Sequence, residues 1–139
     1  MEATIHRAGV SWSGGAGDDA RAHEVLLGAQ TLPSSSALEL GGDGTKSNPE
    51  GLLVGALASC HMLWFLALAR KKGFEIASYE DDADGVLDGK RFTSATLRPR
   101  VRWAGEPPDP EAIEALHQRA HELCFIANSV NFPVGVEPS

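Results

Sequence analysis

The chain has 139 residues, of which 42% are hydrophobic and 22% charged, a size and composition typical of one globular domain over residues 1–139. These values exclude a disordered or fibrous chain. The formal net charge of −7 at pH 7 repels phosphate backbones and anionic lipid surfaces, so we expect neither nucleic acid nor a membrane as a partner.

The first ten residues contain charged side chains and lack the apolar core of a signal peptide, which predicts a cytoplasmic protein. After them, residues 4–12 and 23–27 are rich in β-branched, aromatic and apolar residues. The glycine-rich turn 14–19 separates them, and we expect a β-hairpin. Residues 31–40 are expected to be extended. The following loop, residues 41–44, lacks the spacing of a phosphate-binding loop.

The strongest helix signals bound a stretch from Pro49 to about Lys72. Asn48 is a suitable N-cap, Pro49 suits the first helical position, and Gly73 suits a left-handed C-terminal cap. Residues 51–69 are nearly uncharged and long enough to cross a bilayer. Small residues throughout and the Ser-Cys-His triplet in its middle favour a buried core helix instead.

Three strands are expected next, at residues 74–80, 85–87 and 92–103. A second helix begins after the N-cap Asp109 and ends near Cys124. Its expected buried stripe consists of Ile113, Leu116, Ala120 and Leu123. Residues 131–136 are expected to form a final strand. Strands combined with a long buried helix predict an α+β fold.

The only two cysteines, Cys60 and Cys124, lie far apart in the sequence and form neither a CxxC motif nor a four-ligand zinc cluster. In a reducing cytoplasm such thiols are free or catalytic rather than permanently bridged. Judged from local sequence alone, each is more often a buried apolar residue than a catalyst.

The histidines offer a weaker hypothesis. His117 and His121 are four positions apart on the second expected helix, and with His61 and the two thiols they could ligate a metal. The HExxH pattern is absent. The alternative is a solvated His117, with His61 or His121 making a local hydrogen bond. We therefore predict no metal and no cofactor.

Two separated segments resemble a known family. Residues 48–62 read NPEGLLVGALASCHM, and residues 121–129 read HELCFIANS. They are similar to the central-helix motif and the second cysteine motif of the OsmC/Ohr family. The order of elements also fits, over nearly the whole chain. The resemblance implies an OsmC-like fold, with antiparallel sheets flanking the long buried helix, in an intertwined homodimer with active sites at the subunit interface.

The resemblance also implies a reaction, in which Cys60 attacks an organic hydroperoxide, or hydrogen peroxide, and becomes a sulfenic acid. Cys124 then condenses with it, and a dithiol reductant restores both thiols. Such a peroxidase would serve in oxidative stress. The alternative is a non-catalytic OsmC-like redox sensor or a protein that binds a small apolar ligand.

In the family, a first-turn glutamate, here Glu50, anchors an arginine that favours the reactive thiolate. An acid at this position also stabilises a helix without any function. The family's arginine follows the first strand, where this chain has the glycine-rich turn and then Arg21. The candidates are therefore Arg21, Arg7 or another residue, and without such a group we expect weak activity.

Overall fold

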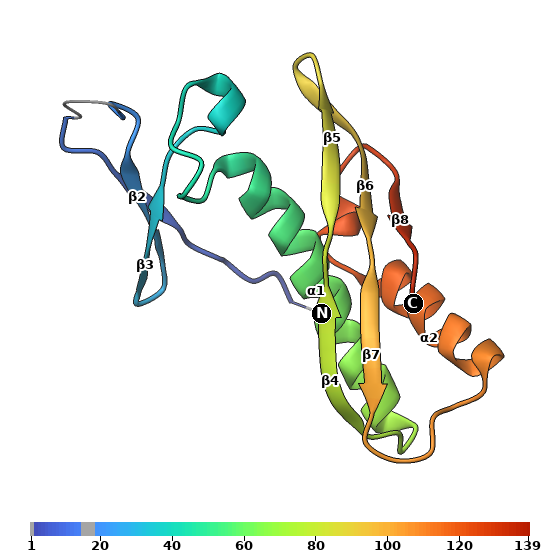
Figure 1. The fold of residues 1–139 in the computed structure, drawn as a ribbon. Coiled ribbons are helices and arrows are strands. Elements are labelled where there is room, and N and C mark those ends of the chain that lie inside the picture. The colour runs from blue at the N-terminus through green and yellow to red at the C-terminus, as the bar shows by residue number, and fades with distance from the viewer. Residues whose placement is uncertain (1, 15–18) are drawn as a thin grey trace. The chain divides into compact units, whose positions relative to one another are not determined.

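A computed structural model describes residues 2–14 and 19–139 of the chain (Figure 1). It divides into two compact units, one up to Leu52 and the other from Leu53 to Ser139. The expectation of a single domain over residues 1–139 stays a prediction.

The first unit contains a three-stranded antiparallel sheet in the order β1-β2-β3. Its strands are β1 (Gly9–Ser11), β2 (His23–Leu27) and β3 (Gln30–Ser34). The predicted pairing of residues 4–12 with 23–27 is confirmed, although β1 has only three residues. Part of the predicted turn, residues 15–18, lies outside the described residues.

The expectation of extended chain over residues 31–40 is wrong beyond β3. Residues Leu38–Leu40 form a short 3-10 helix, η1, which ends at Gly41 with a φ of 89°. A positive φ of this size is readily adopted by glycine because it has no Cβ. The amide N–H groups of Leu40 and Gly42 both donate to the carbonyl of Ala37, at 2.9 and 3.1 Å. These bonds hold the chain in a tight turn.

Gly42 sits against the backbone in this turn, which leads to a stability prediction. A Cβ at this position would lie 1.8 Å from the carbonyl oxygen of Ser36, whereas a Cβ at Gly44 would meet only the side chain of Leu38, at 3.5 Å. We expect Gly42→Ala to lower the free energy of unfolding by roughly 2 kcal/mol or more. The matched Gly44→Ala should change it by less than about 1 kcal/mol. Urea denaturation of both variants checks this, and equal midpoints would contradict it.

The helix α1 (Pro49–Lys71) begins and ends where the sequence predicts. The side chain of Asn48 accepts a hydrogen bond of 2.8 Å from the backbone of Gly51, as an N-cap does. At the other end Gly73 has a φ of 83°, and the N–H of Phe74 donates to the carbonyl of Ala69.

By length and composition α1 could cross a membrane, a criterion that the core helix of a globular protein also meets. Its four buried residues recur at every fourth position and form one stripe: Leu57, His61, Phe65 and Ala69. Phe65 and Ala69 belong to one apolar cluster, and Leu57 belongs to another. α1 is therefore a core helix.

The second unit carries the remaining five strands, and Figure 1 shows them running along its length. They are β4 (Ile76–Asp81), β5 (Asp84–Asp88), β6 (Arg91–Leu97), β7 (Pro99–Trp103) and β8 (Val134–Val136). β4 pairs with β7 and β5 with β6, both antiparallel, while β8 joins β6 in parallel. The final strand expected over residues 131–136 is thus confirmed as β8.

The expectation of one strand over residues 92–103 is wrong, because the segment divides into β6 and β7, which belong to different sheets. The division falls at Arg98. Its backbone N–H donates to Oδ1 of Asp81 at 2.7 Å, and Pro99, which lacks an N–H, follows directly. The Asp81 side chain thus accepts the hydrogen bond that the backbone of a neighbouring strand would otherwise accept from Arg98.

The helix α2 (Pro110–Leu123) starts at the predicted N-cap, where Asp109 accepts from the N–H of Ala112 at 2.9 Å. Leu116 and Ala120 pack with Phe65 of α1 in one core cluster. A second cluster joins α1 to β6, β8 and the segment between α2 and β8. Helices packed beside antiparallel strands confirm the α+β fold class.

Candidate functional site

The second unit brings Cys60 and Cys124 together. Cys60 lies in the middle of α1 and is half-buried, while Cys124 caps the C-terminus of α2 and is only 1% exposed. Both are free thiols, and Cys60 lies near enough to Cys124 to contribute to a raised pKa of the Cys124 thiol. Two neighbouring free thiols are a candidate redox pair.

The electrostatic surroundings favour a protonated Cys124. Burial raises the pKa of this thiol, and its contact with Cys60 adds to the increase. The backbone N–H of Ala127, 3.4 Å from the sulfur, acts in the opposite direction. A thiol that keeps its proton can donate a hydrogen bond to a neighbouring thiolate.

The segment after α2 is held in place around Cys124. The side-chain amide of Asn128 donates to the carbonyls of Glu122 and Cys124, at 3.0 and 2.9 Å. A 3-10 helix, η2 (Ala127–Ser129), follows. These contacts fix the backbone that carries the second thiol.

An aromatic pair lies beside the two cysteines in the sequence. Trp64, one helical turn after Cys60, meets Phe125, which follows Cys124, with ring centroids 5.4 Å apart in an edge-on arrangement. The ring of Phe125 is 52% exposed. The surroundings of the thiol pair are therefore apolar and partly open to solvent.

The other two candidate residues belong to the first unit. Arg21 is exposed, and its guanidinium donates to the carbonyl of Gly41 at 3.3 Å. Glu50 opens α1, and its Oε2 is buried without a hydrogen-bond partner among the described residues. The placement of either residue relative to Cys60 stays a prediction.

The alternative of a solvated His117 is wrong, because this ring is only 4% exposed. It shares a hydrogen bond of 3.0 Å with His61, between His117 Nδ1 and His61 Nε2. The ring of Phe65 also stacks on it, with ring centroids 4.2 Å apart. The outer nitrogens, His61 Nδ1 and His117 Nε2, are buried with no partner in the described part of the chain.

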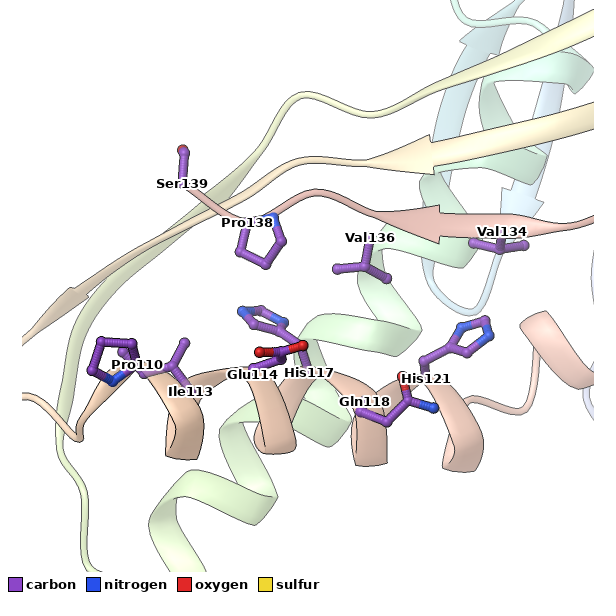
Figure 2. A pocket seen from close by; sticks show the side chains of 10 residues that line it. All are labelled: Pro110, Ile113, Glu114, His117, Gln118, His121, Val134, Val136, Pro138 and Ser139. Carbon is purple, nitrogen blue, oxygen red and sulfur yellow. The ribbon is translucent and has the colours of Figure 1, made fainter.

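No group of three or more His, Cys, Asp or Glu side chains is arranged to hold a metal ion within residues 2–14 and 19–139. Next to the histidines, however, lies a cavity of about 770 Å³ between α2 and the chain from β8 onward. Figure 2 shows His117 and His121 projecting from α2 toward Val134, Val136 and Pro138.

The histidine pair predicts a pH-dependent stability. The pKa of His61 and that of His117 are both lowered to about 4, mainly by burial, and for His61 also by the neighbouring imidazoles of His117 and His121. An imidazole in the unfolded chain binds its proton near pH 6.5. Between these values the unfolded state binds more protons, so stability present above pH 6.5 is lost as the pH falls toward 4.

We expect the free energy of unfolding to fall by about 1 to 2 kcal/mol per ring between pH 7 and pH 5, measured by urea denaturation. Most carboxylates stay ionised in this range. The double variant His61→Leu/His117→Leu, which removes both imidazoles, should flatten the dependence. An unfolding midpoint that is the same at pH 7 and pH 5 in the unsubstituted protein would contradict this prediction.

Comparisons with known proteins give a consistent result. The family model described as OsmC-like protein matches residues 42–139. The structure of an OsmC-like protein of unknown function from Vibrio cholerae superimposes with a TM-score of 0.89 at 32% identity, covering 99% of this chain and 100% of that one. An uncharacterized protein of Bacillus subtilis, YmaD, is 24% identical over 66% of this chain and 65% of its own length, slightly under two thirds.

Two further structures are named for hydroperoxide resistance. The organic hydroperoxide resistance protein OhrB of Bacillus subtilis superimposes with a TM-score of 0.67 at 22% identity, covering 98% and 100% of the two chains. At 22% sequence identity, this match shows only that the two proteins have similar folds. A putative organic hydroperoxide resistance protein of Vibrio cholerae, with captopril bound in one of its active sites, is 25% identical, with a TM-score of 0.70 and 98% and 93% coverage.

Proposed function

This chain belongs to the OsmC-like protein family, and on that basis we propose that it is a thiol-dependent peroxidase that reduces organic hydroperoxides. The observation that carries the proposal is the proximity of the two free thiols, Cys60 and Cys124, by which Cys60 raises the pKa of Cys124. Two neighbouring free thiols can be oxidised to a disulfide.

Cys60 is the nucleophile in this proposal. Cys60 is only half-buried, whereas Cys124 is buried and its raised pKa keeps it protonated. A protonated Cys124 donates to the Cys60 thiolate and stabilises the charge. The two thiols therefore take unequal roles.

The thiolate of Cys60 attacks the outer oxygen of the peroxide, so that an S–O bond forms and the O–O bond breaks. The alkoxide leaves with a proton as an alcohol, and Cys60 becomes a sulfenic acid. The Cys124 sulfur then attacks the Cys60 sulfur, water leaves, and a disulfide forms. A dithiol reductant returns both thiols and is itself oxidised to a disulfide.

Organic hydroperoxides are favoured over hydrogen peroxide by the aromatic pair of Trp64 and Phe125. These rings follow the two cysteines in sequence, contact each other, and expose apolar surface. An alkyl or aryl group gains binding free energy when it covers such a surface, and hydrogen peroxide has no group that can do so.

The family resemblance implies a cation held by Glu50 as a further group of the proposed peroxidase site. Buried carboxylate oxygens without a partner are costly, and Glu50 Oε2 is one. A guanidinium would satisfy this oxygen and place a positive charge at the start of α1. The family resemblance makes Arg21 the first candidate and Arg7 the second.

We expect Arg21→Ala to slow the reaction of the thiols with cumene hydroperoxide by about tenfold or more, because loss of one charge-assisted contact costs on the order of 1.5 to 3 kcal/mol. Arg7→Ala is the matched control and should react at the unsubstituted rate. Stopped-flow measurement of thiol consumption gives both rates. The reverse ranking would assign the cation to Arg7, and two unchanged rates would contradict an arginine in either position.

We also propose that the protein is a cytoplasmic homodimer. The side of α1 opposite its buried stripe is exposed at Gly55, Ser59, Leu63 and Ala67, with Leu63 60% exposed. Small residues and one leucine in a row permit close approach of a second helix. Sedimentation of the purified chain should give the mass of two copies.

The proposal is tested by peroxide consumption with dithiothreitol as the reductant, comparing cumene hydroperoxide with hydrogen peroxide. We expect catalytic turnover of both, with cumene hydroperoxide consumed at least several times faster. Consumption no faster than that by dithiothreitol alone would overturn the peroxidase assignment and leave the redox-sensor or ligand-binding alternative.

A further inference from the structure

The cavity beside α2 has two chemically different walls. On one side α2 contributes Glu114, His117 and His121, which are separated by about one helical turn each. On the other side lie Val134 and Val136 of β8 (Figure 2). A volume of about 770 Å³ is within the range of small-molecule sites, which combine apolar walls with a few polar groups.

The polar wall has groups that are free to bind a ligand. Within the described part of the chain, neither His121 nor Glu114 makes a side-chain hydrogen bond or an ion pair, although both line the cavity. Figure 2 shows the His121 ring directed toward Val134. The ring nitrogens of His121 can form a hydrogen bond with a hydroxyl group.

His117 forms the middle of this wall and is 96% buried, since only 4% of it is exposed. Its Nδ1 is engaged by His61, and its Nε2 has no partner among the described residues. The ring is thus neutral and polar, and it is held rigidly by the stacked ring of Phe65. A rigid neutral ring next to a valine wall suits a flat apolar molecule.

Charge limits the choice of ligand further. Glu114 is the charged side chain of the polar wall, and the whole chain carries a net charge of −7. Both disfavour an anion in the cavity. We propose that this cavity is a second binding site, separate from the cysteine pair, for a neutral aromatic molecule that carries one hydroxyl group, with His121 as its hydrogen-bond partner.

The experiment uses the full-length reduced protein, labelled with ¹⁵N, and p-cresol as the probe. Long-range ¹H–¹⁵N spectra follow the imidazole nitrogens, and calorimetry gives the affinity. We expect saturable binding at one site per chain with a shift of the His121 nitrogens. Toluene, which lacks the hydroxyl, and 4-methylbenzoate, which is anionic, should each bind about five- to tenfold more weakly.

Three variants locate the site. Val136→Trp fills the cavity and should abolish p-cresol binding while peroxide turnover is unchanged. His121→Phe keeps the apolar volume and should remove the preference for p-cresol over toluene. Cys60→Ser should bind p-cresol as the unsubstituted protein does, which separates this site from the proposed peroxidase site. Absence of saturable binding, or equal binding by Val136→Trp, would overturn the inference.

Discussion

Replacement of Cys60 by serine should abolish peroxide turnover, whereas replacement of Cys124 should stop it after one oxidation. A serine hydroxyl is a far weaker nucleophile than a thiolate, so Cys60→Ser leaves nothing that can open the O–O bond. In Cys124→Ser the sulfenic acid of Cys60 still forms, but no thiol lies beside it to form a disulfide. Further peroxide then converts it irreversibly to sulfinic acid.

Intact mass after stepwise addition of cumene hydroperoxide distinguishes these outcomes. Cys60→Ser should keep its mass, and Cys124→Ser should gain first one oxygen atom and then a second. Circular dichroism of each variant controls for loss of fold. If both variants lose a similar, small fraction of their activity, the unequal roles assigned to the two thiols are wrong.

The largest effect on stability is expected for Phe65→Ala. Phe65 is fully buried in α1, where its ring contacts the rings of His117, Tyr79 and Trp103 at centroid distances of 4.2, 5.8 and 6.0 Å. Removing it opens a cavity at the junction of both helices with β4 and β7. Such substitutions cost about 3 to 5 kcal/mol of unfolding free energy.

The matched control is Val86→Ala in β5, because Val86 is apolar but 51% exposed. It should cost less than about 1 kcal/mol. Thermal unfolding followed by circular dichroism compares the two, and we expect a decrease on the order of 10 °C for Phe65→Ala. A decrease no larger than that of Val86→Ala would mean that the core of the second unit does not depend on this ring.

Local signals in the sequence were sufficient to place the helices. The caps at Asn48, Gly73 and Asp109 act through hydrogen bonds and backbone conformations within a few residues, so their sequence signature survives in any tertiary context. The separation of β6 from β7 was missed because its cause, the contact of Arg98 with Asp81, joins residues on different strands.

The histidine pair could not be predicted for the same reason. His61 and His117 are far apart in the sequence, and a histidine alone on a helix is compatible with either a solvated or a buried position. One signal was available: His117 lies four positions after Ile113 and three before Ala120, so helical spacing places it on the predicted buried stripe. The proximity of the two cysteines, in contrast, was expected only from the family resemblance.

The most direct test of the proposed function is the product of a single turnover. Reduced protein is mixed with one equivalent of cumene hydroperoxide, quenched with a thiol-blocking reagent, and analysed by intact mass and peptide mapping. We predict rapid loss of both free thiols and an internal Cys60–Cys124 disulfide, with one cumyl alcohol formed per chain. Slow oxidation at either thiol, with no peptide linking Cys60 to Cys124, would contradict the account.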